Sequence, residues 1–334
     1  MSQFRQNIVT GDWIIMAPER AKRPDQFLPP KAARKVSPKK DCPFEDLKKT
    51  GNWPPILAYP NEEKWEIVVI PNKYPALVHK HGPTCDAPYE QGPYHLLNGS
   101  GHHDLLVTRE HDKDLTKLSV KAALRIFLTL QERYRQLATD KCLQYTSAFF
   151  NFGPGAGASL FHPHYQILTL PIIPHDIRHS LQGSHEYYKK NKECVHCTTI
   201  KYEHKSKKRI VDENDRAIAF APYASSRPFE IRVFPKKHYP CFEHASEADL
   251  EAVVVMLQSV LKRVARHLND PDLNFYIHSA PLKQQNHYHF YHWHIEVIPK
   301  IHPPPGGFEV STGVNINVIE PERAAAMLRG KRAA

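Results

Sequence analysis

The 334-residue sequence contains no long hydrophobic run and few cysteines. No apolar stretch approaches the roughly 20 residues of a membrane-spanning helix, so we expect no membrane association. The N-terminus, MSQFRQNIVTGDW, lacks the apolar core of a secretory signal, and we therefore expect a cytoplasmic location. The six cysteines are too few and too irregularly spaced for a disulfide framework in a chain of this length.

Acidic residues are outnumbered by basic ones, with 45 Lys and Arg against 35 Asp and Glu and a formal charge of +10. This excess fits either a nucleic-acid surface or a solvated surface around a site for a phosphorylated small molecule. Much of it lies in 31–40 (KAARKVSPKK) and 201–209 (KYEHKSKKR), which we interpret as exposed loops because they are polar and turn-prone. Neither run belongs to an aromatic-interleaved nucleic-acid motif, so we expect no nucleic-acid partner.

Histidine is abundant, with 22 residues, and the pattern around the histidines occurs twice. Each half contains a β-like run, a long amphipathic helix, a second β-like run and a His-x-His strand. These segments are 105–111, 118–137, 145–151 and 162–168, and then 231–238, 248–268, 274–278 and 292–298. The repetition predicts an α+β fold built from a duplicated unit, with mostly antiparallel strands and one long helix per half. We expect the halves to be 1–180 and 181–334.

Cysteines and histidines recur in the same register and indicate two metal sites. Cys194 and Cys197 form a Cys-x-x-Cys turn whose thiolates can span a zinc ion, and no thioredoxin-like βαβ pattern surrounds them. Histidines at equivalent positions of the repeat complete the candidate ligand set, which is Cys194, Cys197, His238 and His292. Four protein ligands leave no open position for water, so such sites would be structural.

The first half offers a related but altered set of ligands. Glu45 stands where the second cysteine would be. The candidate ligands are Cys42, Glu45, His111 and His162. Because a carboxylate also binds zinc, this set is a zinc site, a site for another metal, or a site that has lost its metal.

Residues 151–166, NFGPGAGASLFHPHYQ, have the pattern of a phosphoryl-transfer site. Glycines and small residues allow backbone amides to approach an anion closely. On the strand that follows, side chains two positions apart share a face, so His162, His164 and Gln166 point the same way. With His162 engaged in structure or in a metal site, His164 can attack phosphorus and Gln166 can donate to a phosphate oxygen. We expect a two-step transfer between phosphorylated molecules.

Taken with 12–24 (DWIIMAPERAKRP), 72–77 (NKYPAL) and 306–309 (GGFE), this stretch resembles the galactose-1-phosphate uridylyltransferase family. That family is the transferase branch of the histidine-triad superfamily, and the resemblance covers nearly the whole chain. It is most similar to the plant ADP-glucose phosphorylase-like members. The resemblance implies a histidine-triad-like first half that carries the nucleophile and a similar second half with the Cys-x-x-Cys zinc site.

The resemblance also implies roles for individual residues. His164 matches the nucleophile that takes up the nucleoside monophosphate, and Gln166 matches the residue that separates transferases from histidine-triad hydrolases. Arg20 and Arg23 match a pair near the substrate phosphates, which suits guanidinium groups. The other matched substrate-binding positions are Asn72, Asn151, Gly157, Ser159, Phe308 and Glu309.

The family pattern of two metals agrees with the ligands found from the repeat. Some members have iron in the second half in place of zinc, which makes His278 and His294 additional candidate ligands. The resemblance further implies a homodimer with shared active sites.

The expected reaction moves a nucleoside monophosphate from a nucleotide sugar to a hexose-1-phosphate, with UDP-glucose and galactose-1-phosphate as the leading pair. The alternative is an ADP-glucose phosphorylase or adenylyltransferase that uses inorganic phosphate or sulfate as acceptor. Lys73, where uridylyltransferases commonly have Asp, and Tyr165, in place of a small residue, leave the base open. A nucleic-acid-binding zinc protein and a histidine-triad hydrolase are disfavoured by the His-x-His-x-Gln strand and its glycine loop.

Overall fold

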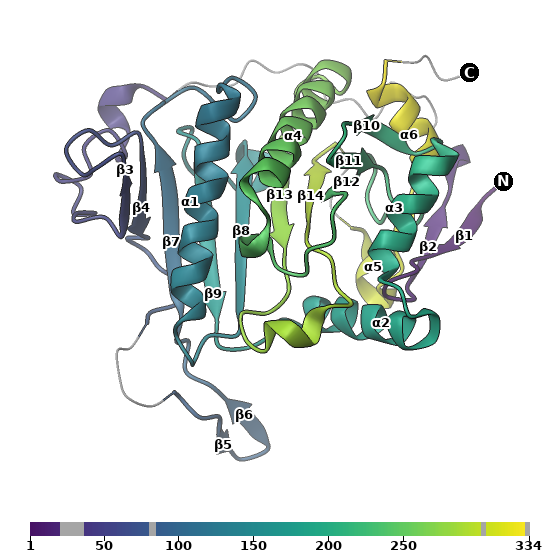
Figure 1. Ribbon diagram of the computed structural model, residues 1–334, viewed down its shortest axis with the longest axis horizontal. Helices are drawn as coiled ribbons and strands as arrows, with labels where there is room; N and C mark the ends of the chain where they lie inside the picture. Colours follow the sequence, from purple (N-terminus) through teal and green to yellow (C-terminus); the bar gives the residue numbers. More distant parts are fainter. Residues whose placement is uncertain (21–36, 80–84, 302–304, 331–334) are drawn as a thin grey trace.

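A broad antiparallel sheet forms the centre of the computed structural model, which describes residues 1–20, 37–79, 85–301 and 305–330 (Figure 1). The strand order is β10-β11-β12-β14-β13-β8-β9-β7-β4-β3. Their bounds are β3 Leu57–Tyr59, β4 Ile67–Pro71, β7 His102–Thr108, β8 Tyr145–Phe152, β9 His164–Leu170, β10 Ile210–Glu213, β11 Ala217–Phe220, β12 Ile231–Pro235, β13 Leu273–His278 and β14 His294–Pro299.

The strand order is a palindrome about the pair β8 and β13, because each half contributes five strands in the same internal order. Equivalent strands are β8 and β13, β9 and β14, β7 and β12, β4 and β11, and β3 and β10. The expected duplicated α+β unit is therefore confirmed. At the junction Phe150 of β8 faces Phe275 of β13, so the two halves share one continuous sheet. The division at residue 180 stays a prediction.

One face of the sheet is covered by two long helices, α1 (Val120–Ala138) and α4 (Glu247–His267), which lie side by side (Figure 1). Each begins at a serine whose hydroxyl accepts from the backbone three residues later, Ser119 from Ala122 and Ser246 from Asp249. Apolar residues at helical spacing face the strands. The main core lies between these helices and the sheet.

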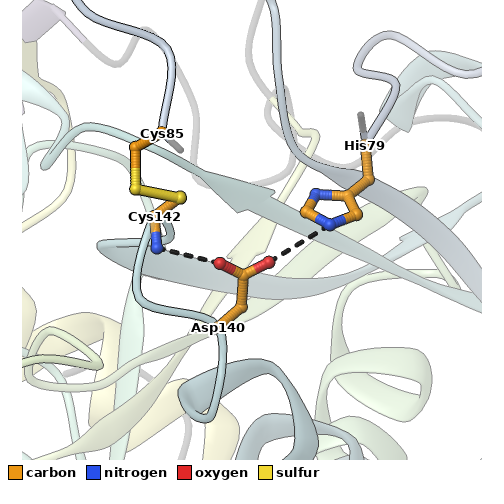
Figure 2. The surroundings of a disulfide bond; sticks show 4 residues. All are labelled: His79, Cys85, Asp140 and Cys142. Carbon is orange, nitrogen blue, oxygen red and sulfur yellow. Dashed lines mark hydrogen bonds and ion pairs between the residues drawn. A yellow bond between two sulfur atoms is a disulfide. The ribbon is translucent and has the colours of Figure 1, made fainter. Parts of the chain in front are cut away.

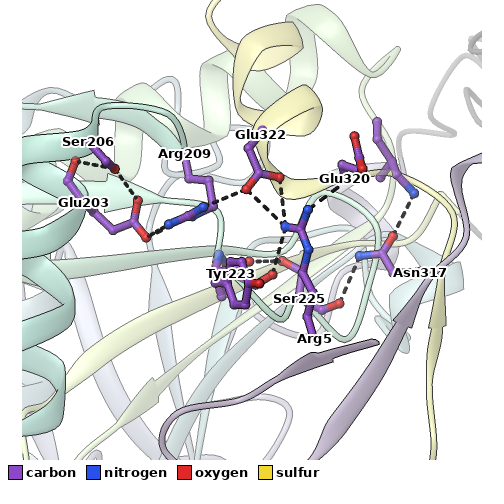
Figure 3. Close-up of polar contacts among 11 residues, drawn as sticks. Arg5, Glu203, Ser206, Arg209, Tyr223, Ser225, Asn317, Glu320 and Glu322 are labelled. Atoms are coloured by element: carbon purple, nitrogen blue, oxygen red, sulfur yellow. Dashed lines mark hydrogen bonds and ion pairs between the residues drawn. The ribbon is translucent and has the colours of Figure 1, made fainter. Parts of the chain in front are cut away.

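A small three-stranded sheet and two short helices lie beside the second half of the central sheet. Strands β1 (Gln3–Gln6) and β2 (Trp13–Met16) are antiparallel, and β15 (Ile316–Asn317) joins β2 in parallel. Helices α5 (Gly307–Thr312) and α6 (Pro321–Leu328) flank β15. Arg5 of β1 and Arg209 both donate to the carboxylate of Glu322, which ties β1 to α6 (Figure 3). A separate hairpin consists of β5 (Tyr89–Gln91) and β6 (Tyr94–Leu96).

One expectation about loops is wrong. Residues 201–206 belong to helix α3 (Val195–Ser206), where Glu203 is buried in an ion pair with Arg209 at 2.6 Å. Residues 31–36 of the other basic run lie outside the described part. The segment between the halves forms helix α2 (His175–Asn191), whose Leu181 packs in a small apolar cluster and anchors it.

A single disulfide joins Cys85 to Cys142 (Figure 2), although no disulfide framework was expected. It connects the segment before β5 to the turn after α1. Beside it, Asp140 accepts from the Cys142 amide at 2.8 Å and lies 3.3 Å from His79 Nε2. The spacing of these cysteines gives no hint of this bridge, because only tertiary folding brings them together.

In the described ranges, no helix has the length and apolar character needed to cross a membrane. The cytoplasmic location stays a prediction.

Candidate active site

Strand β9 presents His164 on the face of the sheet opposite the two long helices. The alternation of the strand sends Tyr165 and Ile167 into the main core and His164 to the other side. The His164 Nδ1 lies 2.9 Å from the carbonyl oxygen of His162. Because a carbonyl oxygen only accepts, Nδ1 carries the proton and Nε2 keeps its lone pair. Burial also lowers the pKa of His164, so the ring is neutral and suited to nucleophilic attack.

Gln166 is held by His103, a residue of β7 that the sequence patterns did not single out. The backbone amide of Ala76 donates to His103 Nδ1 at 3.1 Å, so His103 Nε2 must carry the proton. This Nε2 donates to Gln166 Oε1 at 3.0 Å and also lies 3.0 Å from Asn72 Nδ2. The oxygen of the Gln166 amide is thereby engaged, which leaves its NH₂ group as a donor for an anion beside His164.

The glycine loop between β8 and β9 contains two residues with positive φ. Gly153 and Gly157 have φ of +85° and +86°, a region that favours glycine. Hydrogen bonds to residues of the second half of the chain hold this loop. The Gly155 amide donates to Asp272 Oδ2 at 2.6 Å, and Asn274 donates to Asn151 Oδ1 at 2.8 Å.

A cavity of about 400 Å³ opens in front of these groups. This volume is typical of small-molecule sites. Of the expected substrate-binding residues, Asn72 and Ser159 line it together with the expected catalytic pair. Lys73 also lines it and adds a positive charge. The cavity thus combines a neutral imidazole, an amide donor and a cation, which suits attack on a phosphate ester.

The Cys-x-x-Cys group of the second half has the geometry of a tetrahedral metal site. Cys197 Sγ lies 3.2 Å from His238 Nδ1 and 3.5 Å from His292 Nδ1. Bonds of about 2.0–2.3 Å place tetrahedral donors about 3.5 Å apart, so the residues fit zinc. His238 donates its Nε2 proton to the His289 carbonyl at 2.9 Å, which leaves Nδ1 as the ligand atom. The Cys197 thiol also lowers the pKa of Cys194, which favours the thiolate that a metal binds.

The corresponding group of the first half is equally well formed. His162 Nδ1 lies 3.4 Å from Cys42 Sγ, and His111 Nδ1 lies 2.9 Å from Glu45 Oε1. Both histidines donate from Nε2 to backbone carbonyls, those of Thr108 and Ser37, at 2.7 and 2.8 Å. Because these bonds fix the tautomer, both Nδ1 atoms face the cysteine and the carboxylate. All four donors of each group lie within 4.8 Å of one another, so either group could hold a metal.

Sequence models of a single family match both halves of the chain. The model described as galactose-1-phosphate uridyl transferase, N-terminal domain, matches residues 1–174, and the C-terminal domain model matches residues 180–302. This chain belongs to the galactose-1-phosphate uridylyltransferase family. It is therefore a nucleotidyltransferase of that family.

Individual members of the family are similar along nearly the full length. The ADP-glucose phosphorylase of Arabidopsis thaliana is 32% identical over 331 residues, covering 98% of this chain and 92% of the relative. The galactose-1-phosphate uridylyltransferase of Thermotoga maritima is 27% identical over 338 residues, covering 98% of each. A crystal structure of the Arabidopsis ADP-glucose phosphorylase with bound ADP-glucose superposes with a TM-score of 0.82 at 29% identity and covers 100% of both chains.

Several residues implied by the family resemblance lie away from the cavity within one chain. Arg20 ends a short 3-10 helix after β2, and Phe308 and Glu309 lie on α5. None of the three lines the cavity. Figure 1 places β2 and α5 together at the opposite end of the molecule from β9. Arg23 lies outside the described residues. Asn151, near the end of β8, and Gly157, in the glycine loop, do not line the cavity either.

The alternative iron-type ligands, His278 and His294, form a different kind of group. With Glu296 their donor atoms lie within 4.8 Å. However, the Arg232 guanidinium lies 3.3 Å from Glu296 Oε2 and keeps the pKa of that buried carboxyl low. Since a buried cation already neutralises the carboxylate, this donor set does not suit a metal.

The sequence patterns missed His103, Asp272 and Asn274. Alternation along 102–108 could have placed His103 on the face that carries the expected catalytic residues of β9. No local pattern could have found Asp272 and Asn274, because they reach the glycine loop only through the pairing of β8 with β13.

Proposed function

We propose that the protein transfers a nucleoside monophosphate from a nucleotide sugar to a phosphate-bearing acceptor through His164. The supporting observation is the neutral imidazole whose Nδ1 proton is fixed on a carbonyl, with Nε2 available as the attacking atom. Nε2 bonds to the α-phosphorus, and the bond from that phosphorus to the oxygen of the departing hexose-1-phosphate breaks. The Gln166 amide, oriented by His103, donates to a phosphate oxygen as negative charge develops.

ADP-glucose is the donor we propose first, with inorganic phosphate as the acceptor. The support is the 32% identity to the Arabidopsis ADP-glucose phosphorylase and the presence of Lys73 where uridylyltransferases commonly have Asp. Lys73 would supply a counterion to either phosphate-bearing acceptor, so it bears on the base and not on the choice of acceptor. UDP-glucose with galactose-1-phosphate is the second candidate, supported by 27% identity to the Thermotoga maritima uridylyltransferase over 98% of both chains.

We also propose that the two histidine-containing donor groups hold zinc. A bound zinc ion would supply fixed geometry and local folding energy. It would add no open coordination position, since each group provides four ligands. In the first half, His162 would hold the start of β9 and thus position His164 two residues later.

A homodimer is the assembly we propose, with Arg20, Arg23, Phe308 and Glu309 reaching the cavity of the other copy. Support comes from the separation between α5 and β9 within one chain (Figure 1). Arg20 and the short helix α5 at that end would add contacts to the cavity of the other copy.

Intact-protein mass spectrometry tests the central step. The protein is mixed separately with ADP-glucose and UDP-glucose, and we expect an acid-labile mass increase of one nucleoside monophosphate with the preferred donor. His164→Ala should abolish the adduct, whereas the exposed control His175→Ala should keep it. An adduct that survives in His164→Ala, or no adduct with either donor in metal-replete protein, would contradict the proposal. Release of the adduct by inorganic phosphate or by galactose-1-phosphate identifies the acceptor.

A further inference from the structure

A second cavity, of about 430 Å³, lies in the second half of the chain between β1, α3 and the strands β11 and β12. Strand register shows that it is the repeat counterpart of the catalytic cavity. In the first half Leu105 pairs with Ile70 and with Gln166, and in the second Arg232 pairs with Phe220 and with Glu296. Leu105 and Arg232 line the respective cavities.

Other lining residues of the two cavities also occupy equivalent positions of the repeat. Residues 72–74, after β4, line the catalytic cavity, and residues 222–224, after β11, line the second one. Phe44, two residues after Cys42, is matched by His196, two residues after Cys194. The duplication has therefore preserved a hollow at both positions while the side chains around it have changed.

Because of these changes, the second cavity lacks the imidazole and amide groups that line the first. The counterparts of His164 and Gln166 are His294 and Glu296, and neither lines the second cavity. Phe234, where the first half has Val107, stacks on His294 with ring centroids 4.7 Å apart, and Arg232 binds Glu296. The second cavity thus has no accessible nucleophile at the equivalent position, and its remaining capacity is binding.

The cations around the second cavity are already neutralised. Of the described lining residues, the positively charged ones are Arg209 and Arg232. Arg209 is paired with Glu203 and with Glu322 at 2.6 Å each (Figure 3). Arg232 is paired with Glu230 at 2.9 Å and with Glu296. The segment 279–291, which corresponds to the glycine loop, contains no glycine. A phosphate group would find neither a spare cation nor a backbone cradle here.

Aromatic rings dominate the remaining surface. Tyr202 and Tyr223 are 61% and 50% exposed, and both flank the Arg209 guanidinium at 5.8 and 5.2 Å. Ile8 from the loop after β1 is 55% exposed and completes the mouth. Such surfaces favour a flat ligand that covers apolar area and stacks on rings.

The lining also offers a polar group in need of a partner. His196 is 3% exposed, and its Nε2 makes no hydrogen bond within the described part of the chain. Buried polar atoms of this kind are uncommon and gain from a ligand with donors or acceptors on its edge. We propose that the second cavity is a binding site for an uncharged nucleoside, separate from the catalytic cavity and independent of the reaction proposed above.

A fluorescent reporter at the mouth tests this assignment. Tyr202→Trp places an indole beside the cavity, and Tyr94→Trp, at an exposed position on the β6 hairpin, is the matched control. Adenosine, uridine and AMP are titrated into the full-length protein. We expect saturable quenching of Trp at 202 by at least one nucleoside and no matching change at 94. AMP should bind at this reporter no more tightly than adenosine.

A second pair of variants, made in the reporter background, locates the ligand. Ile8→Ala removes an exposed lining side chain and should weaken nucleoside binding at least threefold, while Val255→Ala, on the outer side of α4, should leave it unchanged. Three results would each overturn the proposal: no saturable response to either nucleoside at millimolar concentration, an unchanged affinity in Ile8→Ala, or AMP binding more than tenfold tighter than adenosine.

Discussion

Replacing Gln131 or Gln258 by leucine tests how much hydrogen bonds between the two halves contribute to stability. The two glutamines are repeat counterparts on α1 and α4, and both are buried. Gln131 donates to the carbonyls of Phe242 and Ala245 at 2.8 and 3.1 Å, in the other half. Gln258 donates to the equivalent carbonyls of the first half, at 2.7 and 3.0 Å. Each amide therefore ties its helix to the start of the other helix.

The loss in free energy of unfolding comes from the carbonyl groups that no longer accept from the glutamine amide. A leucine side chain fills similar space but removes both bonds that the amide donates; in Gln131→Leu the Phe242 carbonyl keeps only the Ala245 amide, at 3.2 Å. The loss of two net hydrogen bonds and the desolvation of buried acceptors sum to about 2–4 kcal/mol. With an unfolding entropy of about 2.1 cal/mol/K per residue, a chain of 334 residues should lose about 3–6 °C in Tm for either variant.

Calorimetry or circular dichroism during heating measures the effect. We expect Gln131→Leu and Gln258→Leu to lower one shared transition by similar amounts, because the sheet runs unbroken through β8 and β13. Gln182→Leu, an exposed change on α2, should stay within about 0.5 kcal/mol of the native protein. Two separate transitions, or a shift under about 1 °C for both buried variants, would refute the reasoning.

Three further predictions rest on other contacts. Gly183→Ala should destabilise the protein by about 1–2 kcal/mol in urea unfolding, despite better helix propensity, because the added Cβ would lie 1.7 Å from the Val9 carbonyl oxygen; an unchanged midpoint would contradict this close packing. Cys197→Ser should lose one metal equivalent per chain by elemental analysis and lower Tm, whereas the buried Cys241→Ser should keep its metal; equal metal content in both variants would argue against the second-half site. Burial alone would raise the pKa of Glu322, but hydrogen bonds from its two arginine partners outweigh it and lower the pKa. Its ionised form therefore stabilises the fold above pH about 4.5 and loses this contribution as the pH falls, so Glu322→Gln should flatten the acid limb of a stability–pH curve.

Periodic patterns predicted most of the central architecture. The two amphipathic stretches became α1 and α4, and the β-like runs became the inner strands, because burial against a sheet selects helical or alternating apolar positions. The same alternation placed His164 and Gln166 on one face. Local pattern failed at 201–206, which we expected to be an exposed loop and which is part of helix α3.

Contacts between distant segments were beyond the reach of the sequence patterns. His103 was missed because its importance arises only where β7 pairs with β9. The disulfide between Cys85 and Cys142 and the anchoring of the glycine loop by Asp272 have the same origin. Their partners are set by chain topology, which no short-range spacing encodes.

The sequence by itself determined the duplication, the family, the residues of both candidate metal groups and the strand that carries the expected nucleophile. These features depend on residue type and spacing, which are local. The tertiary structure alone decided that the strand order is palindromic and that His103 fixes the Gln166 amide. It also decided that the counterpart of the catalytic cavity remains open in the second half, with its cations neutralised. The physical reason is that hydrogen-bond direction, charge pairing and cavity shape depend on which distant residues meet.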